Sequence, residues 1–149
     1  MLAKSSELTA AKWNFTGLCE YTDPGVKYIN SGSFVMKYNA TARAGINLND
    51  VTITADNTAK KIFISIPPAT VQDIKVDVSS IKYYNEVFAP FNFNPKDDNN
   101  TAVAKAESDA YEEAQKSGIL EMANEQSATL IKGILSDAIP KGYTIEVKQ

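Results

Sequence analysis

The chain has 149 residues with no histidine, a single cysteine and a single arginine, Arg43. Without histidine it cannot form a Ser-His-Asp triad, a Cys-His pair or a HExxH zinc site. One cysteine excludes CxxC motifs and an intrachain disulfide. The net charge of −3 provides no basic surface, so we expect no nucleic-acid partner. Carboxylate or lysine chemistry and hard-cation binding remain possible.

A chain of this length can bury a core of its own. We predict a single globular domain over 1–149, with residues 1–6 as a flexible tail or the remnant of a removed leader. No stretch approaches the ~20 apolar residues that a bilayer-spanning helix needs. The first seven residues also lack the apolar core of a signal peptide. We interpret Cys19 as a buried strand residue, because free cysteine is among the most buried residue types.

The first two thirds of the chain show strand patterns. Residues 8–21 place Trp13 and Phe15 on one face of a strand. The clearest strand follows over 33–45, where apolar and polar residues alternate strictly. We predict that one face is buried and the other exposed. The buried set is Phe34, Met36, Tyr38, Ala40, Ala42 and Ala44, and the exposed set is Lys37, Asn39, Thr41 and Arg43.

The pattern continues with a hairpin, in which 51–54 and 62–66 flank a turn at 56–59. Pro67 and Pro68 end its second arm, because proline cannot donate to a strand ladder. Residues 69–85 alternate less regularly and predict one or two further strands. Residues 89–95 form an aromatic loop bounded by prolines.

The period then changes to that of helices. We predict one helix over 98–117 and another over about 119–138, followed by a closing strand at 143–147. Alanines recur every fourth residue in the first helix, so we expect this stripe to face the sheet or the second helix at close range; it contains Ala102, Ala106, Ala110 and Ala114. The apolar face of the second helix contains Ile119, Met122, Ala123, Leu130, Ile131, Ile134, Leu135 and Ala138. The predicted fold is α+β: an antiparallel sheet of about five to seven strands, two C-terminal helices packed on one face, and a closing strand.

No catalytic, cofactor-binding or metal-binding residue is predicted. The acidic pairs Glu112/Glu113 and Glu121/Glu125 are typical of solvated helix surface, and the residues at 97–100 lack the order of a calcium loop. Without imidazole, we expect no tightly bound transition metal. The segment best suited to a partner surface is the aromatic one, through Phe88, Phe91 and Phe93.

Several segments resemble a known bacterial family in order and spacing. They are Ala42-Arg43-Ala44-Gly45-Ile46-Asn47-Leu48, Ile64-Ser65-Ile66-Pro67-Pro68-Ala69, Gly118-Ile119-Leu120-Glu121-Met122-Ala123, Gly142-Tyr143-Thr144-Ile145-Glu146-Val147 and the opening segments around Ser6 and Trp13. The chain resembles the domain of unknown function 4230 family over nearly its whole length. The resemblance implies no known activity, cofactor or catalytic residue. Asn47 departs from the pattern, which usually has Asp there. If that carboxylate has a function in relatives, this chain lacks its charge; the alternative is that either residue caps the turn after the strand.

The resemblance also implies a location, because members of the family often carry an upstream hydrophobic segment. We therefore expect a non-enzymatic binding or scaffold module outside the cytoplasm, secreted or anchored in the membrane near the cell surface. Its partner would be a protein, a glycan or a membrane surface. Two alternatives stay open: an enzyme that depends on carboxylates or a hard metal, and an intracellular partner-binding domain in the cytoplasm.

Overall fold

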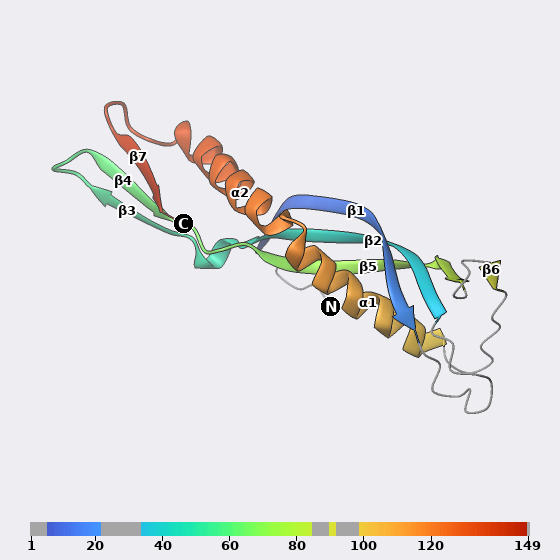
Figure 1. Cartoon of the computed structure of the whole chain (residues 1–149). Coiled ribbons are helices and arrows are strands. Elements are labelled where there is room, and N and C mark those ends of the chain that lie inside the picture. The colour runs from blue at the N-terminus through green and yellow to red at the C-terminus, as the bar shows by residue number, and fades with distance from the viewer. Residues whose placement is uncertain (1–5, 22–33, 85–89, 92–98, 149) are drawn as a thin grey trace, which may run out of the picture. The chain divides into compact units, whose positions relative to one another are not determined.

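The computed structural model describes residues 6–21, 34–84, 90–91 and 99–148. In this part the chain forms seven strands, two α-helices and one 3-10 helix (Figure 1). They are β1 (Glu7–Tyr21), β2 (Phe34–Asn47), η1 (Leu48–Asp50), β3 (Thr52–Asp56), β4 (Lys61–Ser65), β5 (Thr70–Tyr84), β6 (Pro90–Phe91), α1 (Asn99–Lys116), α2 (Ile119–Ser136) and β7 (Thr144–Lys148). The predicted α+β class, the two C-terminal helices and the closing strand are confirmed.

The strands are divided between two sheets, where the sequence pattern predicted one. The first has the order β1-β2-β5-β6 and the second the order β3-β4-β7. β3 and β4 form the predicted antiparallel hairpin, with Thr52 opposite Ser65. β7 pairs with β4 in parallel, with Lys61 opposite Thr144. A parallel pair needs a long crossover connection, and the chain between β4 and β7 supplies one. Strand alternation reports which face is buried and carries no information on the neighbouring strand, so this arrangement was not predictable from the pattern.

The chain divides into two compact units. Unit 1 contains the described residues within 1–12, 43–72 and 117–149, and unit 2 those within 13–42 and 73–116. The residue ranges of β1, β2 and β5 run through both units. Each unit is assembled from separate stretches of chain. The single domain over 1–149 stays a prediction.

Unit 1 buries the inner face of β4 and one narrow stripe of α2. Ile62, Ile64 and Ile66 are buried on the strand side. On α2 the buried residues recur every fourth position, at Ile119, Ala123, Ser127 and Ile131. The predicted apolar face was broader and is wrong in part: Met122, Leu130, Ile134 and Ala138 are exposed. The small side chains of Ala123 and Ser127 allow close packing in the middle of this stripe, and the adjacent stripe is left outside.

The turn after β2 in unit 1 is held by Asn47. Its side-chain Oδ1 accepts a hydrogen bond from the Asn49 backbone N–H at 3.0 Å and from the Ser6 hydroxyl at 2.7 Å. Asn47 is the N-cap residue of η1. The interpretation of this position as a cap is therefore confirmed, and an amide oxygen performs the role as well as a carboxylate would.

Unit 2 shows the predicted alternation of β2. Met36, Tyr38, Ala40 and Ala42 are buried, whereas Lys37 and Asn39 are exposed and Thr41 is half-buried. In unit 1 the same alternation continues, with Arg43 exposed and Ala44 buried. The side chain of Phe34 lies outside the described residues.

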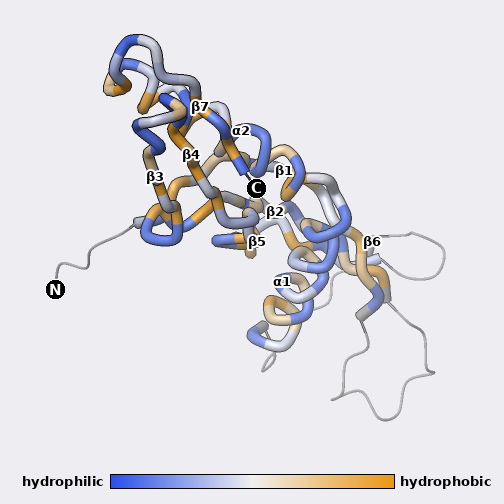
Figure 2. Tube along the Cα trace, turned by 90° about the vertical axis from the view of Figure 1, so that its left-hand side faces the viewer, coloured by the Kyte–Doolittle hydropathy of each residue, from blue (hydrophilic) through white to orange (hydrophobic). Residues whose placement is uncertain are grey.

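The alanine stripe of α1 is buried as predicted, with each of its four alanines at most 1% exposed. Ala102, Ala106 and Ala110 pack in one apolar cluster with the buried face of β2 and with Val76 of β5. Orange and blue segments alternate along the turns of α1 in Figure 2, as expected for a helix that buries one face. Tyr111 lies beside the stripe and is about half exposed. Because alanine adds little bulk, the α1 backbone can approach the sheet closely.

Candidate functional site

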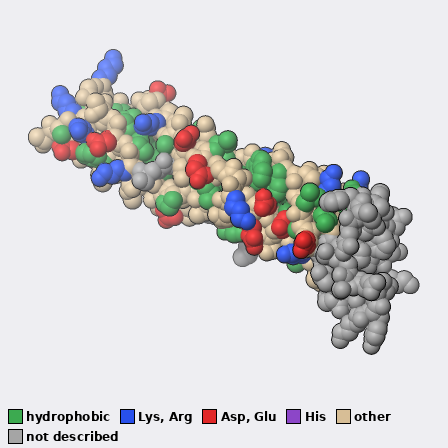
Figure 3. Space-filling model, in the orientation of Figure 1, with side chains coloured by type: hydrophobic (Ala, Val, Ile, Leu, Met, Phe, Trp, Pro, Cys, Tyr) green, Lys and Arg blue, Asp and Glu red, His purple; other side chains and the backbone are tan. Residues whose placement is uncertain are grey.

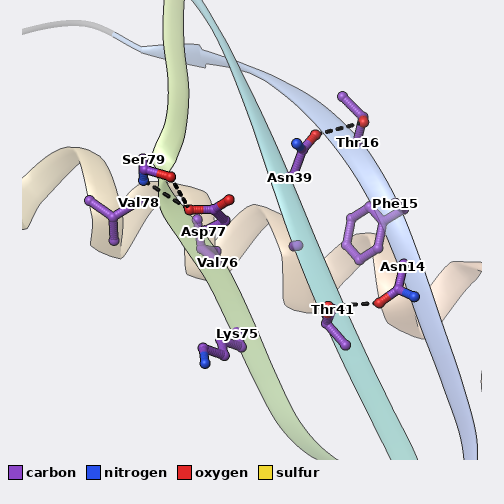
Figure 4. Close-up of a pocket in the computed structure, with 11 residues that line it drawn as sticks. Asn14, Phe15, Thr16, Asn39, Thr41, Lys75, Val76, Asp77, Val78 and Ser79 are labelled. Atoms are coloured by element: carbon purple, nitrogen blue, oxygen red, sulfur yellow. Dashed lines mark hydrogen bonds between the residues drawn. The ribbon is translucent and has the colours of Figure 1, made fainter.

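A polar groove lies on the sheet face of unit 2 that points away from α1 (Figure 4). Its volume is about 870 Å³, within the range of small-molecule sites. Three strands line it: β1 with Asn14, Phe15 and Thr16, β2 with Asn39, Ala40 and Thr41, and β5 with Lys75, Val76, Asp77, Val78 and Ser79. The outward residues of β1 and β2 reach it through the same alternation that buries their neighbours against α1.

Two amide–hydroxyl pairs cross from β1 to β2 in the groove. Thr16 Oγ1 donates to Asn39 Oδ1 at 2.8 Å, and Thr41 Oγ1 donates to Asn14 Oδ1 at 2.8 Å. Each threonine thereby occupies the oxygen end of its asparagine amide. The NH₂ end, which carries two donor hydrogens, remains free of these pairs. In Figure 4 the NH₂ group of Asn39 points toward β5.

The third wall of the groove contains an irregularity in β5. Ile74 and Val76 pack in the core cluster, and so do Ile81 and Tyr83. The first pair has even numbers and the second has odd numbers, although successive strand residues alternate between faces. One extra residue must therefore lie between Val76 and Ile81, and we assign a β-bulge there. It turns Val78 outward, to 48% exposure.

Hydrogen bonds within the bulge explain its stability. Asp77 Oδ1 accepts from the Ser79 N–H at 3.0 Å and from the Ser79 hydroxyl at 2.6 Å. The Ser80 hydroxyl donates to the Asp77 carbonyl at 2.6 Å and accepts from the Asn39 N–H of β2 at 2.8 Å. A serine side chain thus links β2 and β5 at this point of the bulge. Bulges are common beside functional sites, where they redirect side chains.

A second hollow, of about 370 Å³, lies in the same unit. Phe15 and Thr16 line both hollows, and Trp13, Gly17, Leu18 and Glu113 complete the smaller one. The rings of Trp13 and Phe15 stack at a centroid distance of 4.0 Å and an interplanar angle of 12°. Both side chains are half-buried. The sequence pattern placed these aromatics on one strand face, and Phe15 packs against the core cluster and against Tyr38 on that face.

Cys19 and Tyr38 are buried on the α1 side of the sheet. Both side chains stay protonated at neutral pH, whereas a nucleophile has to be deprotonated. Tyr38 donates its hydroxyl to Asp109 Oδ2 of α1 at 2.6 Å. Burial, and then this hydrogen bond and the charge of Asp109, raise the pKa of Tyr38 far above its usual value. Burial, reinforced by Asp109, raises the pKa of Cys19 to about 11. Both groups are neutral at physiological pH, whereas a nucleophilic cysteine needs a lowered pKa.

The charged residues of the visible surface are mixed in sign. In Figure 3 lysine, aspartate and glutamate side chains are interspersed with hydrophobic ones and do not gather in one patch of a single sign. Within residues 6–21, 34–84, 90–91 and 99–148, no group of three or more Cys, Asp or Glu side chains is placed to hold a metal ion. The helices in those same ranges are too short or too polar for a membrane span.

The aromatic segment expected to bind a partner falls largely outside this description. Phe88 and Phe93 lie outside the described residues. Phe91 belongs to β6, where its backbone pairs with Tyr83 of β5, and its side chain is not described. The partner surface at these three residues therefore stays a prediction. The groove residues were missed because asparagine, threonine and serine on an outward strand face look like ordinary solvated surface.

Comparison with family models matches residues 2–148 to the family described as a protein of unknown function, DUF4230. The chain belongs to the DUF4230 family. The suggested resemblance is thus confirmed over essentially the whole chain. No curated protein and no solved structure matches this DUF4230 chain. Family membership assigns no activity, so the function of this DUF4230 member has to be argued from the geometry of the groove.

Proposed function

We propose that this chain is a non-enzymatic binding module that acts outside the cytoplasm near the cell surface, and that the groove of unit 2 is its binding site. The observation that carries the proposal is the pair of oriented amides on β1 and β2. Thr16 and Thr41 hold the oxygen ends of Asn39 and Asn14, so each amide is fixed in direction, and the NH₂ group of Asn39 points toward β5 in Figure 4. Groups already oriented for a ligand reduce the entropy cost of binding.

The protonation of the other candidate groups favours binding over catalysis. Glycoside hydrolysis, the carboxylate chemistry best suited to a groove, uses two acidic side chains on opposite sides of the bond. Among the described residues that line the groove, Asp77 is the one carboxylate, and one of its oxygens accepts hydrogen bonds from Ser79. The Cys19 thiol is buried, and its pKa of about 11 keeps it protonated at neutral pH. A bound ligand would therefore leave the groove unchanged.

The location rests on the family resemblance, because relatives often carry a hydrophobic segment upstream of the corresponding region. Fusion of the complete natural gene to alkaline phosphatase tests it, because this enzyme is active only outside the cytoplasm. We expect a phosphatase-positive fusion. An inactive phosphatase fusion combined with a fluorescent cytoplasmic one would place the protein inside the cell and favour the intracellular alternative.

Co-sedimentation with isolated bacterial cell envelopes tests the binding role. The groove variant is Asn39→Asp, which keeps an acceptor for the Thr16 hydroxyl but loses the NH₂ donor. Its matched control is Asn57→Asp in unit 1, where the Asn57 Oδ1 also accepts from a hydroxyl, that of Tyr143, at 2.9 Å. We expect the parent and the control to sediment with envelopes and Asn39→Asp to remain in solution. Equal sedimentation of all three, or release of soluble fragments that grows with time, would overturn the proposal.

A further inference from the structure

β3 forms one edge of the second sheet, in unit 1, and among the described residues no strand lies beside its outer side. In Figure 1 β4 lies between β3 and β7. All five residues of β3 are exposed, and their pairing with β4 is regular from end to end. Proteins usually protect a sheet edge with lysine, proline or a bulge, and β3 has none of these. This edge is therefore open to another strand.

The hydrogen bonds between β4 and β7 show which backbone groups β4 directs to β3. The Thr144 N–H donates to the Lys60 carbonyl at 3.0 Å, and the Ile66 N–H donates to the Lys148 carbonyl at 2.9 Å. Successive residues of a strand direct their N–H and C=O groups to opposite sides. Even-numbered residues along β4 therefore bond to β7, and the odd-numbered residues between them bond to β3.

This alternation leaves backbone groups of β3 at the open edge. Thr54 lies opposite Phe63, an odd-numbered residue of β4, so the Thr54 backbone bonds to β4. Its neighbours Ile53 and Ala55 direct their groups outward and offer two donors and two acceptors. The Ile53 side chain shares a face with its partner Ile64, yet Ile64 is 1% exposed and Ile53 is 52% exposed. A further strand would bond the four backbone groups and cover Ile53.

A second copy of β3 fits this edge in an antiparallel register centred on Thr54, which pairs all five residues of each strand. Ile53 of one copy then lies opposite Ala55 of the other, and their backbone groups form four hydrogen bonds. Thr54 lies opposite itself in the close, non-hydrogen-bonded pair, where two threonines interact favourably. Asp56, the one charged residue of the strand, lies opposite Thr52. Like charges therefore do not meet in this register.

The opposite edge of the sheet is unsuited to the same pairing. Glu146 is the central residue of β7, so a register that pairs the whole strand with a second copy would place Glu146 opposite itself. Like charges directly opposite one another are destabilising. Pairing of β3 with β3 also closes the assembly at two copies, because each contributes the same surface.

We propose that the β3 edge is a dimerisation surface, at which two copies of this chain join their three-stranded sheets into one continuous sheet. The proposal is independent of the groove, because β3 belongs to unit 1 and the groove residues belong to unit 2.

Sedimentation velocity over a series of protein concentrations measures the association, up to about 1 mM because interfaces of this small size are weak. We expect the mass of the parent to rise with concentration toward that of two chains. Thr54→Lys should weaken the association at least tenfold, because two ammonium groups would then face each other. The matched control is Thr144→Lys, which adds the same charge to an exposed threonine on the same face of the sheet, at the β7 edge. It should associate like the parent.

Charge reversal tests the register. Thr54→Lys and Thr54→Glu should each associate weakly alone, whereas an equal mixture of the two should associate at least as well as the parent. A cross-link provides a second measurement: Thr54→Cys combined with Cys19→Ala should oxidise to a covalent dimer, because Cα atoms of a non-hydrogen-bonded pair lie ~4.5 Å apart, within disulfide range. Thr144→Cys in the same background should stay monomeric.

Three results would overturn the proposal. A parent that stays monomeric at every concentration would leave the edge to a different partner. Equal association of the parent and Thr54→Lys would place the interface elsewhere, such as the exposed face of α2. A mixture that associates no better than either charged variant alone would exclude the register centred on Thr54. If circular dichroism shows that the charged variants do not fold, the cross-link decides, and absence of a covalent Thr54→Cys dimer would overturn the proposal.

Discussion

The ring of Tyr38 lies directly over Gly17, on the neighbouring strand of unit 2. A Cβ atom added to Gly17 would overlap the Tyr38 ring at its hydroxyl-bearing end. Tyr38 is fully buried and is tethered to Asp109 by its hydroxyl, so the ring cannot swing away without losing that bond. The position of Gly17 is therefore set by the side chain above it.

Replacing Gly17 with alanine should lower the free energy of unfolding by about 1–3 kcal/mol, the usual cost of overpacking. Chemical denaturation followed by circular dichroism would measure the loss. The control is Gly133→Ala in α2, where an added Cβ meets nothing within 4 Å and alanine should stabilise the helix by about 0.5–1 kcal/mol. A Gly17→Ala variant as stable as the parent would contradict the close approach of the ring.

The alanine stripe of α1 makes a second prediction. Ala110 is completely buried in the core cluster of unit 2, so Ala110→Leu should cost about 1–3 kcal/mol of unfolding free energy through overpacking. Ser108→Leu introduces the same side chain on the exposed side of the helix and should change stability by less than about 0.5 kcal/mol. Thermal melts of both variants decide the matter. Equal melting temperatures would mean that the stripe tolerates bulk and does not pack closely.

Cys19 makes stability depend on alkaline pH. Its pKa rises from an ordinary value of about 9.0 to about 11 in the folded chain, so the unfolded chain releases this proton first as the pH increases. The stabilisation is complete below pH 9 and is lost between pH 9 and 11, by about 2–3 kcal/mol. Cys19→Ala should therefore flatten the fall in stability over this interval, measured by denaturation at several pH values. An identical pH dependence in parent and variant would contradict the raised pKa.

Ser127 predicts a gain in stability. Its side chain is completely buried in α2, and its hydroxyl has no hydrogen-bond partner within the described residues. A buried hydroxyl without a partner costs about 1–3 kcal/mol, and alanine is the better helix former. Ser127→Ala should raise the free energy of unfolding by about 1 kcal/mol or more. Ser136→Ala is the comparison, because that hydroxyl is exposed and already donates to the Gly133 carbonyl; a loss of stability in Ser127→Ala would reveal a hydrogen bond.

The sequence by itself determined most of the local elements and the buried faces of β2 and α1. The strict alternation around Tyr38 and the four-residue spacing of alanines around Ala106 are patterns of single elements, and burial of an apolar face follows from them wherever the element docks. The turn cap at Asn47 belongs to the same class, because its partner Asn49 is two residues away.

Only the tertiary structure decided which elements are neighbours and what their outward faces build. The parallel pairing of β7 with β4, the division into two sheets and the exposure of Met122 on α2 depend on contacts between distant segments. The groove depends on them too: Asn14, Asn39 and Asp77 come from three strands and are unremarkable on each one. The β-bulge that turns Val78 outward forms where Ser80 accepts from the backbone of Asn39, a contact between positions far apart in the chain. Hydrophobic periodicity records burial, and polar side chains that converge across strands leave no period in the sequence.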